Sequence, residues 1–322
     1  MMFKKIFDKV YDEKFNSRCD DPGYNKYYTY KDFAGMKEEP FSFVNKKGDA
    51  VRGGLYYYGD GIDGFDCFVV FFHGMNAGYL AYMNEINMLA KAGFLVLSYD
   101  YAATFSSDGK ALEGFGRPLS DFEDALKAIK ADRKLSEKTM FVMGHSWGGY
   151  TALNALNMTD AIKAAVCVSP PISYKAIIRQ SFPGILGRMI EKPALEYERG
   201  IFGDLIYLSG LTVADNDTPI LFIYSKDDPT ITYKYNYKPL EKADDNPNHT
   251  RIVFTDKDHF PLMTRSAIKK LRARQAQVAQ WFSDGKTAEE IRALSKGVVW
   301  DEMVEQDEEV WQKVIGFFRT NK

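Results

Sequence analysis

The sequence predicts an α/β protein with a mostly parallel central sheet, flanking helices and a small helical cap. Short apolar runs alternate with helical patterns along the chain, and the later runs lack the polar alternation of a half-exposed strand. The 322 residues, of which 45% are hydrophobic and 27% charged, suffice for a sizeable core. Because strand–helix–strand units connect with a right-handed crossover, this alternation favours strands that lie parallel in one sheet.

Eight apolar runs are the expected strands. They lie at 41–44, 54–58, 67–72, 94–99, 139–143, 164–169, 220–224 and 251–254. The first two are joined by short turns and are expected to form an antiparallel edge. The other six are rich in Val, Ile, Leu, Phe and Tyr, which is typical of strands covered on both faces.

Helical patterns separate these strands. Three stretches, at 81–92, 120–131 and 149–157, lie between consecutive runs and are expected to flank the sheet. Ser120 followed by Glu123 fits a capping box, in which each side chain bonds a backbone N–H at the helix start. The second helix is therefore expected to begin at Ser120.

Two segments interrupt the alternation, and neither indicates a second domain. Residues 171–217 contain Pro, Gly, aromatic side chains and two helix-like pieces, and are expected to form a cap over the carboxyl ends of the strands. Residues 262–322 are expected to be C-terminal helices, the last with an apolar face at i, i+3, i+4 and i+7 spacing. With 1–40 as an N-terminal extension, residues 1–322 are interpreted as a single domain.

The charge and cysteine content argue against several classes of function. The formal net charge of −2 disfavours nucleic acid as a partner, because its binding needs a clustered basic surface. Three cysteines provide neither a disulfide framework nor metal-ligand spacing. We expect no membrane span and no signal peptide, because no window approaches 18 apolar residues and charges interrupt the first ten. A cytoplasmic location follows as an expectation, and the oligomeric state stays open.

One helical stretch near the C-terminus is unusually basic. It carries Arg265, Lys269, Lys270, Arg272 and Arg274. Such a run can indicate an anionic partner, but it is more often a solvated helix face. We expect a solvated face here.

The strongest chemical signal is the sequence GHSWGG at 144–149, which follows an expected strand and opens an expected helix. That context is the one required by the nucleophile-elbow motif G-x-S-x-G. The turn is so tight that Ser146 must adopt strained backbone angles, and Gly144 and Gly148 provide the small neighbours it needs. The helix amino terminus adds partial positive charge beside the Ser146 hydroxyl. The sequence therefore predicts Ser146 as a nucleophile.

A serine nucleophile needs a base, and the chain offers four histidines. His145 lies inside the elbow, His73 belongs to another motif, and His249 lies in a polar cluster expected to be a solvated loop. His259 follows the last expected core strand, in a loop at a carboxyl strand end. By elimination and position, His259 is predicted to be the base.

The acid that orients this base should follow the preceding strand. Two adjacent carboxylates, Asp227 and Asp228, come after the run at 220–224. Either one could fix the imidazole tautomer and stabilise the imidazolium that forms during reaction. The chain order of serine, aspartate and histidine differs from the orders in chymotrypsin and in subtilisin.

A further motif places backbone donors near the nucleophile. His73 and Gly74 follow the strand at 67–72, and this turn can direct the N–H of Met75 towards Ser146. Together with the N–H of Trp147 it is predicted to form an oxyanion hole. Each donor of such a hole contributes roughly two to three orders of magnitude in rate.

These pieces, spread over about residues 65–265, resemble the α/β-hydrolase-fold serine hydrolases, the superfamily of many esterases, lipases and peptidases. The family pattern after the corresponding strand reads G-x-x-D-x-x-V, and the sequence SKDDPTI at 225–231 matches it with Ser225 in place of Gly. The resemblance thus selects Asp228 over Asp227 as the acid. It implies the α/β-hydrolase fold, a triad of Ser146, Asp228 and His259, and hydrolysis without a cofactor.

Three details depart from that family pattern or compete with it. The usual Gly before the histidine is Asp258, which is expected to influence the pKa of the base. The loop at 100–109 resembles the family's D-x-R-G-x-G segment but lacks its Arg, which bears on loop conformation. The sequence GDGIDG at 59–64 has the form of a dinucleotide-binding motif, but a strand follows it, so a hairpin turn is expected instead.

The sequence therefore predicts a serine esterase acting on a small-molecule carboxylic ester of modest size, with cap aromatics such as Phe182, Tyr197 and Phe202 facing an apolar acyl or aryl group. A serine peptidase or amidase is the main alternative, because the fold and triad are common to both. A non-catalytic ligand-binding protein is disfavoured by the complete triad. A dehalogenase would need a carboxylate where Ser146 stands.

Overall fold

The computed structural model describes residues 11, 14–213 and 215–322. Its strands are β1 Lys37–Val44, β2 Ala50–Tyr57, β3 Cys67–Phe72, β4 Leu95–Tyr99, β5 Thr139–His145, β6 Ile162–Val168, β7 Ile220–Ser225 and β8 His249–Phe254. They form one sheet in the order β1-β2-β4-β3-β5-β6-β7-β8. The pairs β1–β2 and β2–β4 are antiparallel and the others parallel. The predicted α/β class and its antiparallel edge are confirmed.

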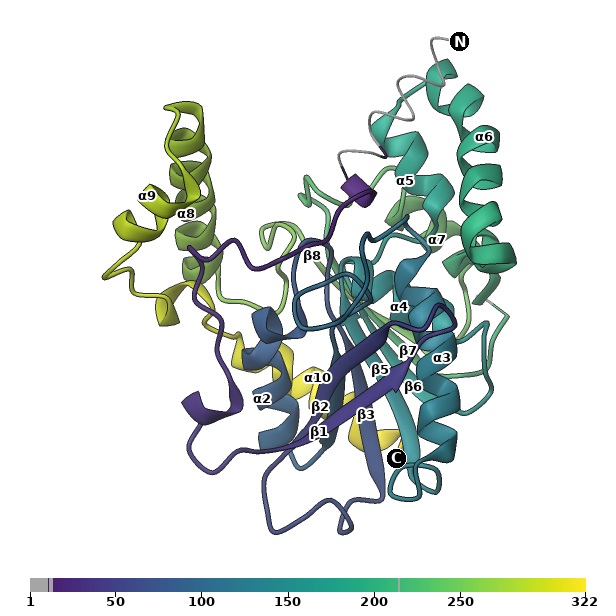
Figure 1. Cartoon of the computed structure of the whole chain (residues 1–322). Coiled ribbons are helices and arrows are strands. Elements are labelled where there is room, and N and C mark those ends of the chain that lie inside the picture. Colours follow the sequence, from purple (N-terminus) through teal and green to yellow (C-terminus); the bar gives the residue numbers. More distant parts are fainter. Residues whose placement is uncertain (1–10, 12–13, 214) are drawn as a thin grey trace.

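Helices cover both faces of this sheet (Figure 1). The α-helices are α2 Met83–Lys91, α3 Arg117–Ala131, α4 Trp147–Ala155, α5 Tyr174–Ser181, α6 Ile185–Phe202, α7 Tyr237–Ala243, α8 Arg265–Ser283, α9 Ala288–Leu294 and α10 Glu308–Thr320. Short 3-10 helices are η1 Tyr30–Asp32, η2 Tyr79–Tyr82, η3 Gly203–Tyr207, η4 Gly210–Val213 and η5 Asp301–Met303. Buried side chains of α3 and α4 pack on one face, and those of α2 and α10 on the other.

Strand β3 illustrates why the central runs lack polar alternation. All six of its residues are buried. Phe68 and Val70 belong to the core cluster under α3 and α4, whereas Val69 and Phe71 belong to the one under α2 and α10. Because alternate side chains of a strand point to opposite faces, a strand between two helical layers must be apolar at every position.

The start of α3 differs from the predicted one. The helix begins at Arg117, three residues before Ser120, and has Pro118 in its first turn. Ser120 therefore lies inside the helix, where it is buried and its hydroxyl has no partner among the described residues. Proline favours a first turn because its fixed backbone angle suits the helix and its missing N–H costs nothing there.

Two helical walls rise above the carboxyl end of the sheet (Figure 1). Helices α5 and α6, from the expected cap segment, stand on one side. Helices α8 and α9 stand on the other, and the N-terminal segment crosses between them. The predicted C-terminal helices thus lie in two different places. Helix α10 packs on the sheet, whereas α8 and α9 stand beside its upper end.

Among residues 11, 14–213 and 215–322, no helix combines the length and apolar character that a bilayer crossing requires.

Candidate active site

Ser146 lies in the turn between β5 and α4, as the motif predicts. Its backbone has φ 58° and ψ −120°, in the left-handed region that only a strongly constrained residue adopts. A side chain at Gly144 would collide with the Gly148 carbonyl, and one at Gly148 with the Phe72 carbonyl. Both glycines are therefore required by the close approach of the turn to its neighbours. The hydroxyl is carried at the positive end of α4.

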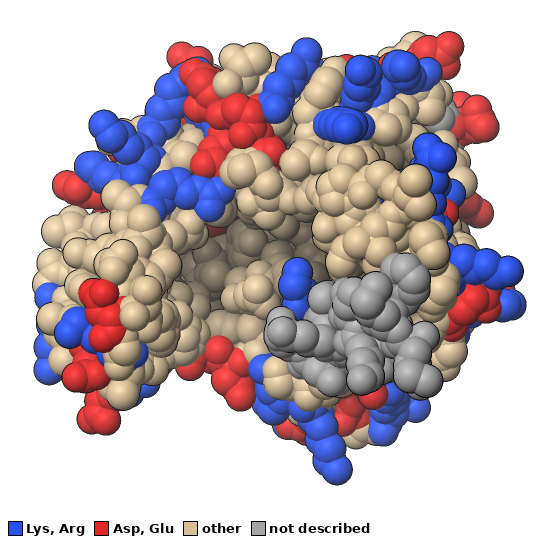
Figure 2. Space-filling model, turned by 90° about the horizontal axis from the view of Figure 1, so that it is seen from above, with Lys and Arg blue, Asp and Glu red and all other residues tan. Residues whose placement is uncertain are grey.

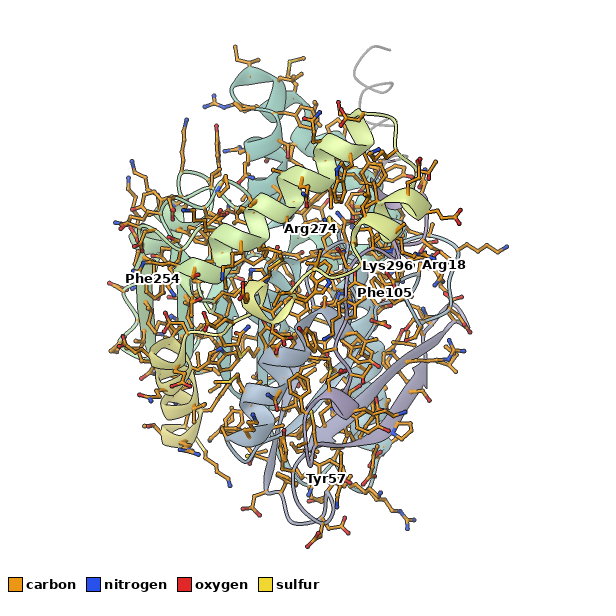
Figure 3. The ribbon with its side chains drawn as sticks, turned by 90° about the vertical axis from the view of Figure 1, so that its left-hand side faces the viewer. Arg18, Tyr57, Phe105, Phe254, Arg274 and Lys296 are labelled. Atoms are coloured by element: carbon orange, nitrogen blue, oxygen red, sulfur yellow. The ribbon has the colours of Figure 1, made fainter. Side chains whose placement is uncertain are left out.

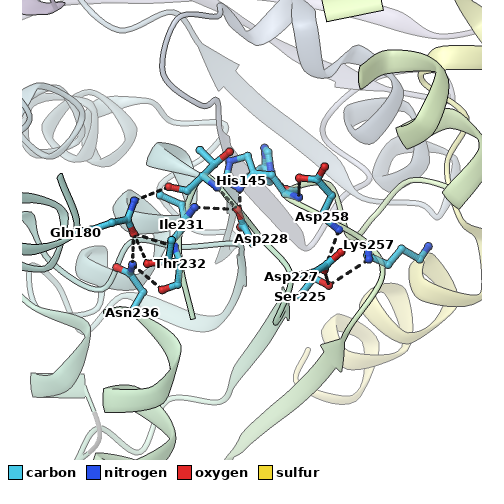
Figure 4. A network of polar contacts seen from close by, with 12 residues as sticks. His145, Gln180, Ser225, Asp227, Asp228, Ile231, Thr232, Asn236, Lys257 and Asp258 are labelled. Carbon is cyan, nitrogen blue, oxygen red and sulfur yellow. Dashed lines mark hydrogen bonds and ion pairs between the residues drawn. The ribbon is translucent and has the colours of Figure 1, made fainter. Parts of the chain in front are cut away.

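His259 pairs with Asp228 across the loops that follow β8 and β7. The His259 Nδ1 and Asp228 Oδ2 atoms are 2.7 Å apart, and both side chains are buried. The other carboxylate oxygen of Asp228 accepts the N–H groups of Thr230, at 2.7 Å, and Ile231, at 2.8 Å. Figure 4 shows this carboxylate at the centre of its network. The pair leaves the Nε2 atom of His259 as the nitrogen available for proton exchange.

Asp227 points away from this pair. Its carboxylate accepts the Ser225 hydroxyl and, at 3.2 Å, the N–H of Asp258 (Figure 4). Of the two adjacent carboxylates, the structure therefore brings Asp228 to His259 and gives Asp227 a bracing position between two loops. Ser225, which stands where the family pattern has Gly, supplies a hydroxyl to that brace.

Ser146 and His259 line the same cavity, of about 530 Å³. No hydrogen bond joins their side chains in this structure, in which both residues are described. Contacts of this kind are often long in the absence of substrate and shorten when it binds. The His73–Gly74 turn forms another part of the cavity wall near Ser146, because Gly74 and Met75 also line the cavity.

The His73 ring fixes this turn from inside the protein. Its Nδ1–H donates to the Gly74 carbonyl at 2.9 Å, while Nε2 accepts the Tyr101 N–H at 3.2 Å. Burial lowers the pKa of His73 to about 4, so the ring is neutral at pH 7. Because both nitrogens are engaged, His73 supports the turn and is not a second base.

The two predicted oxyanion donors, Met75 and Trp147, both line the cavity. Trp147 is the first residue of α4, so its N–H has no acceptor within the helix. Among the described residues, no backbone acceptor of the Met75 N–H is found. Both N–H groups thus belong to residues of the cavity that Ser146 lines, and the oxyanion hole stays a prediction.

His145, inside the elbow, holds the loop of His259. Its Nε2–H donates to the His259 carbonyl at 2.6 Å, and its Nδ1 accepts the Tyr82 hydroxyl at 3.1 Å. Burial, followed by the nearby His259, lowers the pKa of His145 to about 3. A neutral His145 thus ties the serine turn directly to the histidine loop, a role that the sequence analysis did not identify.

The family comparison can now be added to this geometry. The sequence matches a protein-family model described as "Serine aminopeptidase, S33" over residues 66–201. This match and the fold agree. The chain has the α/β-hydrolase fold. No sequence among the curated proteins matches it.

Solved α/β-hydrolase structures resemble it at low sequence identity. The esterase Pf2001 of Pyrococcus furiosus is 21% identical with a TM-score of 0.57, covering 84% of this chain and 98% of that one. An acetyl xylan esterase from Paenibacillus sp. R4 is 15% identical with a TM-score of 0.55, covering 81% and 88%. The acylaminoacyl peptidase of Pyrococcus horikoshii is 17% identical with a TM-score of 0.50, covering 71% and 38%. At these identities the similarity establishes the fold alone.

The cap segment and the N-terminal segment line the cavity from above the sheet. Ile177 of α5, Ile190 of α6 and Phe182 between these helices line it, as does Phe15 of the N-terminal segment. Of the three expected cap aromatics, only Phe182 is among the lining residues. The rings of Tyr197 and Tyr11 meet edge to face with centroids 4.7 Å apart, and Phe202 is buried against the start of α3.

Arg18 supplies the guanidinium that the loop at 100–109 lacks. Its two terminal nitrogens donate to the carbonyls of Phe105, Ser107 and Gly109 at 2.7–2.9 Å. Figure 3 shows Arg18 and Phe105 close together. A residue from the N-terminal segment thus orders a loop for which the family pattern has an internal arginine. No local sequence signal could have linked positions so far apart.

One more expectation is corrected by the contacts. His249 is buried rather than solvated, and its Nδ1 lies 2.7 Å from the Asp244 carboxylate. The basic face of α8 is solvent-exposed at Arg265, Lys269 and Lys270, as expected, whereas Arg274 is buried. Asp258 has φ 50°, where Gly is favoured, and its carboxylate bonds Arg272 and the His259 N–H. Although burial opposes the shift, these partners lower the pKa of Asp258.

No cluster of candidate metal ligands occurs within the part of the chain that the structure describes.

Proposed function

We propose that this α/β-hydrolase is a serine esterase that cleaves a carboxylic ester of modest size through an acyl-enzyme on Ser146. The observation that carries the proposal is the cavity in which the strained Ser146 meets the buried His259–Asp228 pair. A serine hydroxyl is a weak nucleophile, and it becomes effective when a neighbouring imidazole removes its proton. The walls of the cavity are mostly apolar, which suits an acyl or aryl group.

The proposed reaction has two halves. The Ser146 Oγ attacks the ester carbonyl carbon and its proton passes to His259 Nε2, while the N–H groups of Met75 and Trp147 receive the oxyanion. Collapse of the tetrahedral intermediate breaks the bond to the alcohol oxygen, which takes the proton from His259. Water then gives a proton to His259 and attacks the acyl carbon, which releases the acid and restores Ser146.

Within this scheme Asp228 would act through His259. Its carboxylate holds Nδ1 protonated, so that Nε2 is the basic nitrogen, and it stabilises the imidazolium. The bonds from Thr230 and Ile231 keep the carboxylate in place. His145 would be a positioning residue, because it contacts the His259 carbonyl and none of the reacting atoms.

Amide hydrolysis is a second candidate, favoured by the match to the family model described as a serine aminopeptidase. The same residues could cleave an amide, since the two reactions differ mainly in leaving-group protonation and in the contacts of the leaving group. Parallel assays on esters and on aminoacyl amides with the same acyl group separate the two functions. We expect kcat/KM to be higher for the ester.

The test of the proposal is the Ser146→Ala variant. Removing a triad nucleophile costs many orders of magnitude in kcat, so we expect kcat/KM on an activated short-chain ester to fall at least about 1,000-fold. The matched control is Ser181→Ala, because Ser181 lines the same cavity but lies in the cap. Turnover retained by Ser146→Ala, at an unchanged circular dichroism spectrum, would refute the assignment.

A further inference from the structure

A second cavity, of about 540 Å³, adjoins the one that holds Ser146. The two share five lining residues, which are Met75, Asn76, Tyr82, His145 and Phe260. Seen from above, a deep hollow with few charged side chains separates the two walls of the molecule (Figure 2). We call the second cavity the α8 chamber, because α8 forms one of its walls, and the first the cap chamber.

The α8 chamber is lined by the face of α8 that looks towards the body of the protein. Leu271, Val278 and Phe282 lie on this face, and Ala81 and Leu262 lie opposite. Part of this face is open to the cavity, since Val278 is half-buried and Ala279 exposed. A helix whose apolar face lines an open cavity leaves that face available to a ligand.

Two contacts join α8 to other segments of the chain near the chamber. The buried Arg274 guanidinium lies 5.6 Å from the ring centroid of Trp300, and 5.0 Å from that of Trp281 on the same helix. Arg274 projects from α8 in Figure 3. At the carboxyl end of the helix, the rings of Phe282 and Tyr24 meet edge to face with centroids 5.8 Å apart. Edge-to-face aromatic and cation–π contacts of this kind stabilise the position of the wall.

The chamber also has polar groups. Glu85 lines it and accepts a bond from Gln306 Nε2 at 3.3 Å. Burial raises the pKa of Glu85 to about 7. The Nε of Arg274, on the wall, has no partner among the described residues. A ligand in the chamber is therefore mainly apolar, with at most a small polar group.

The two chambers meet at the loop of His259. Ser146, Trp147 and His259 line the cap chamber, whereas Phe260, which follows His259, and His145, which bonds the His259 carbonyl, line both chambers. Because His259 must give its proton to the leaving oxygen, the leaving alcohol lies next to this loop, from which the α8 chamber extends. The acyl group, bound to Ser146, then remains in the cap chamber.

Resting on the proposed function, we propose that the α8 chamber binds the alcohol part of the substrate and the cap chamber its acyl part. The substrate class is then an ester with an extended apolar group on each side of the carbonyl. The helix α8, which follows the His259 loop, is then a specificity element.

Two isomeric esters test the proposal, because octyl acetate and ethyl octanoate carry the same atoms on opposite sides of the carbonyl. In Val278→Trp, which fills the α8 chamber, we expect kcat/KM for octyl acetate to fall at least about tenfold and that for ethyl octanoate to change less than about threefold. Ile177→Trp, which fills the cap chamber, should give the reverse pattern. Ethyl acetate, which needs neither chamber, serves as the reference.

The matched control is Ala276→Trp, on the same helix but exposed and outside the chamber lining. It should leave all three substrates unchanged. The proposal is overturned if Val278→Trp affects both isomers alike, affects ethyl octanoate more, or affects neither. Failure of the proposed function looks different, because Ser146→Ala would then retain the activity of the parent protein on every ester.

Discussion

At the scale of single residues, the loop of His259 is held by three neighbours that bind its two ends. Asp258 bonds Arg272 on α8, Asp227 accepts the Asp258 N–H, and His145 donates to the His259 carbonyl. The backbone at Asp258 has φ 50°, so the charge pair compensates a conformation that Gly would adopt freely. The position of His259, the proposed base, thus depends on polar contacts rather than on a regular element.

The two adjacent carboxylates have different proposed roles. Asp228 orients His259, whereas Asp227 braces the loop that carries it. Asp228→Asn loses the charge that fixes the Nδ1 proton of His259, so we expect kcat to fall about 10,000-fold. Asp227→Asn keeps an oxygen for the Ser225 hydroxyl and should cost less than about tenfold. Steady-state kinetics on one activated ester decide between them, and the opposite ranking would assign the acid to Asp227.

These residues were predictable to different degrees. Ser146, His259 and the two aspartates follow from short motifs placed after strands. The roles of Tyr82 and His145 did not follow, because their bonds depend on a loop more than 100 residues away from His145. A bond between distant positions leaves no local pattern in a single sequence.

At the scale of elements, a buried carboxylate joins the cap to the core. Glu198 of α6 accepts the N–H groups of Phe115, at 2.6 Å, and Gly116, at 3.0 Å, which precede α3. It also accepts the Tyr11 hydroxyl. Burial raises the pKa of Glu198 to about 8, although the N–H groups oppose the shift. Glu198 therefore does for α3 what Ser120 was expected to do.

Removing this carboxylate should loosen the cap. In Glu198→Ala the two buried N–H groups lose their acceptor, so we expect the free energy of unfolding to fall by about 1–3 kcal/mol. KM should rise more than kcat falls, because the cap lines the substrate cavity. Urea unfolding and steady-state kinetics measure both effects. Glu196→Ala, exposed on the same helix, is the control, and an equal loss there would contradict the role of Glu198.

The elements themselves follow closely from the sequence, whereas their partners do not. The six parallel strands were predictable because burial on both faces removes polar residues from a strand. The N-terminal segment carries no comparable pattern, although Arg18 orders one loop and Phe15 lines the cavity. Its function depends on contacts with segments that are remote in the chain.

At the scale of the whole molecule, two helical walls enclose the site. The cap was expected from the irregular composition of 171–217. The second wall was not, because the helical pattern of 262–322 does not tell which helices pack on the sheet and which stand beside the site. Within 262–322, α10 buries Val310, Trp311, Val314 and Phe318 against the sheet, whereas α8 buries little besides Ala267, Ile268 and Arg274.

Buried neutral histidines make the stability of the whole fold sensitive to acid. Burial lowers the pKa of His73 to about 4, below the ordinary value of about 6.5. Between pH 6.5 and pH 4, His73 therefore binds a proton in the unfolded chain but not in the folded chain. The free energy of unfolding falls as the pH drops from about 6.5 towards 4. The expected slope is about 1.4 kcal/mol per pH unit for this group.

Urea unfolding between pH 7 and pH 4 measures this slope. His73→Asn keeps an amide donor for the Gly74 carbonyl but carries no titrating group, so its curve should be flatter than that of the parent by the His73 contribution. The difference between the two proteins cancels the titration of the carboxylates they share. Parallel curves would contradict a neutral, buried His73.

The most direct test of the central claim is to identify the residue that a fluorophosphonate labels. The reagent forms a covalent bond with an activated serine hydroxyl, and peptide mass spectrometry locates the adduct. We predict one adduct per chain, on the peptide that contains Ser146, with loss of ester hydrolysis in proportion to labelling. Labelling at another residue, or full hydrolysis by a protein labelled at Ser146, would contradict the account.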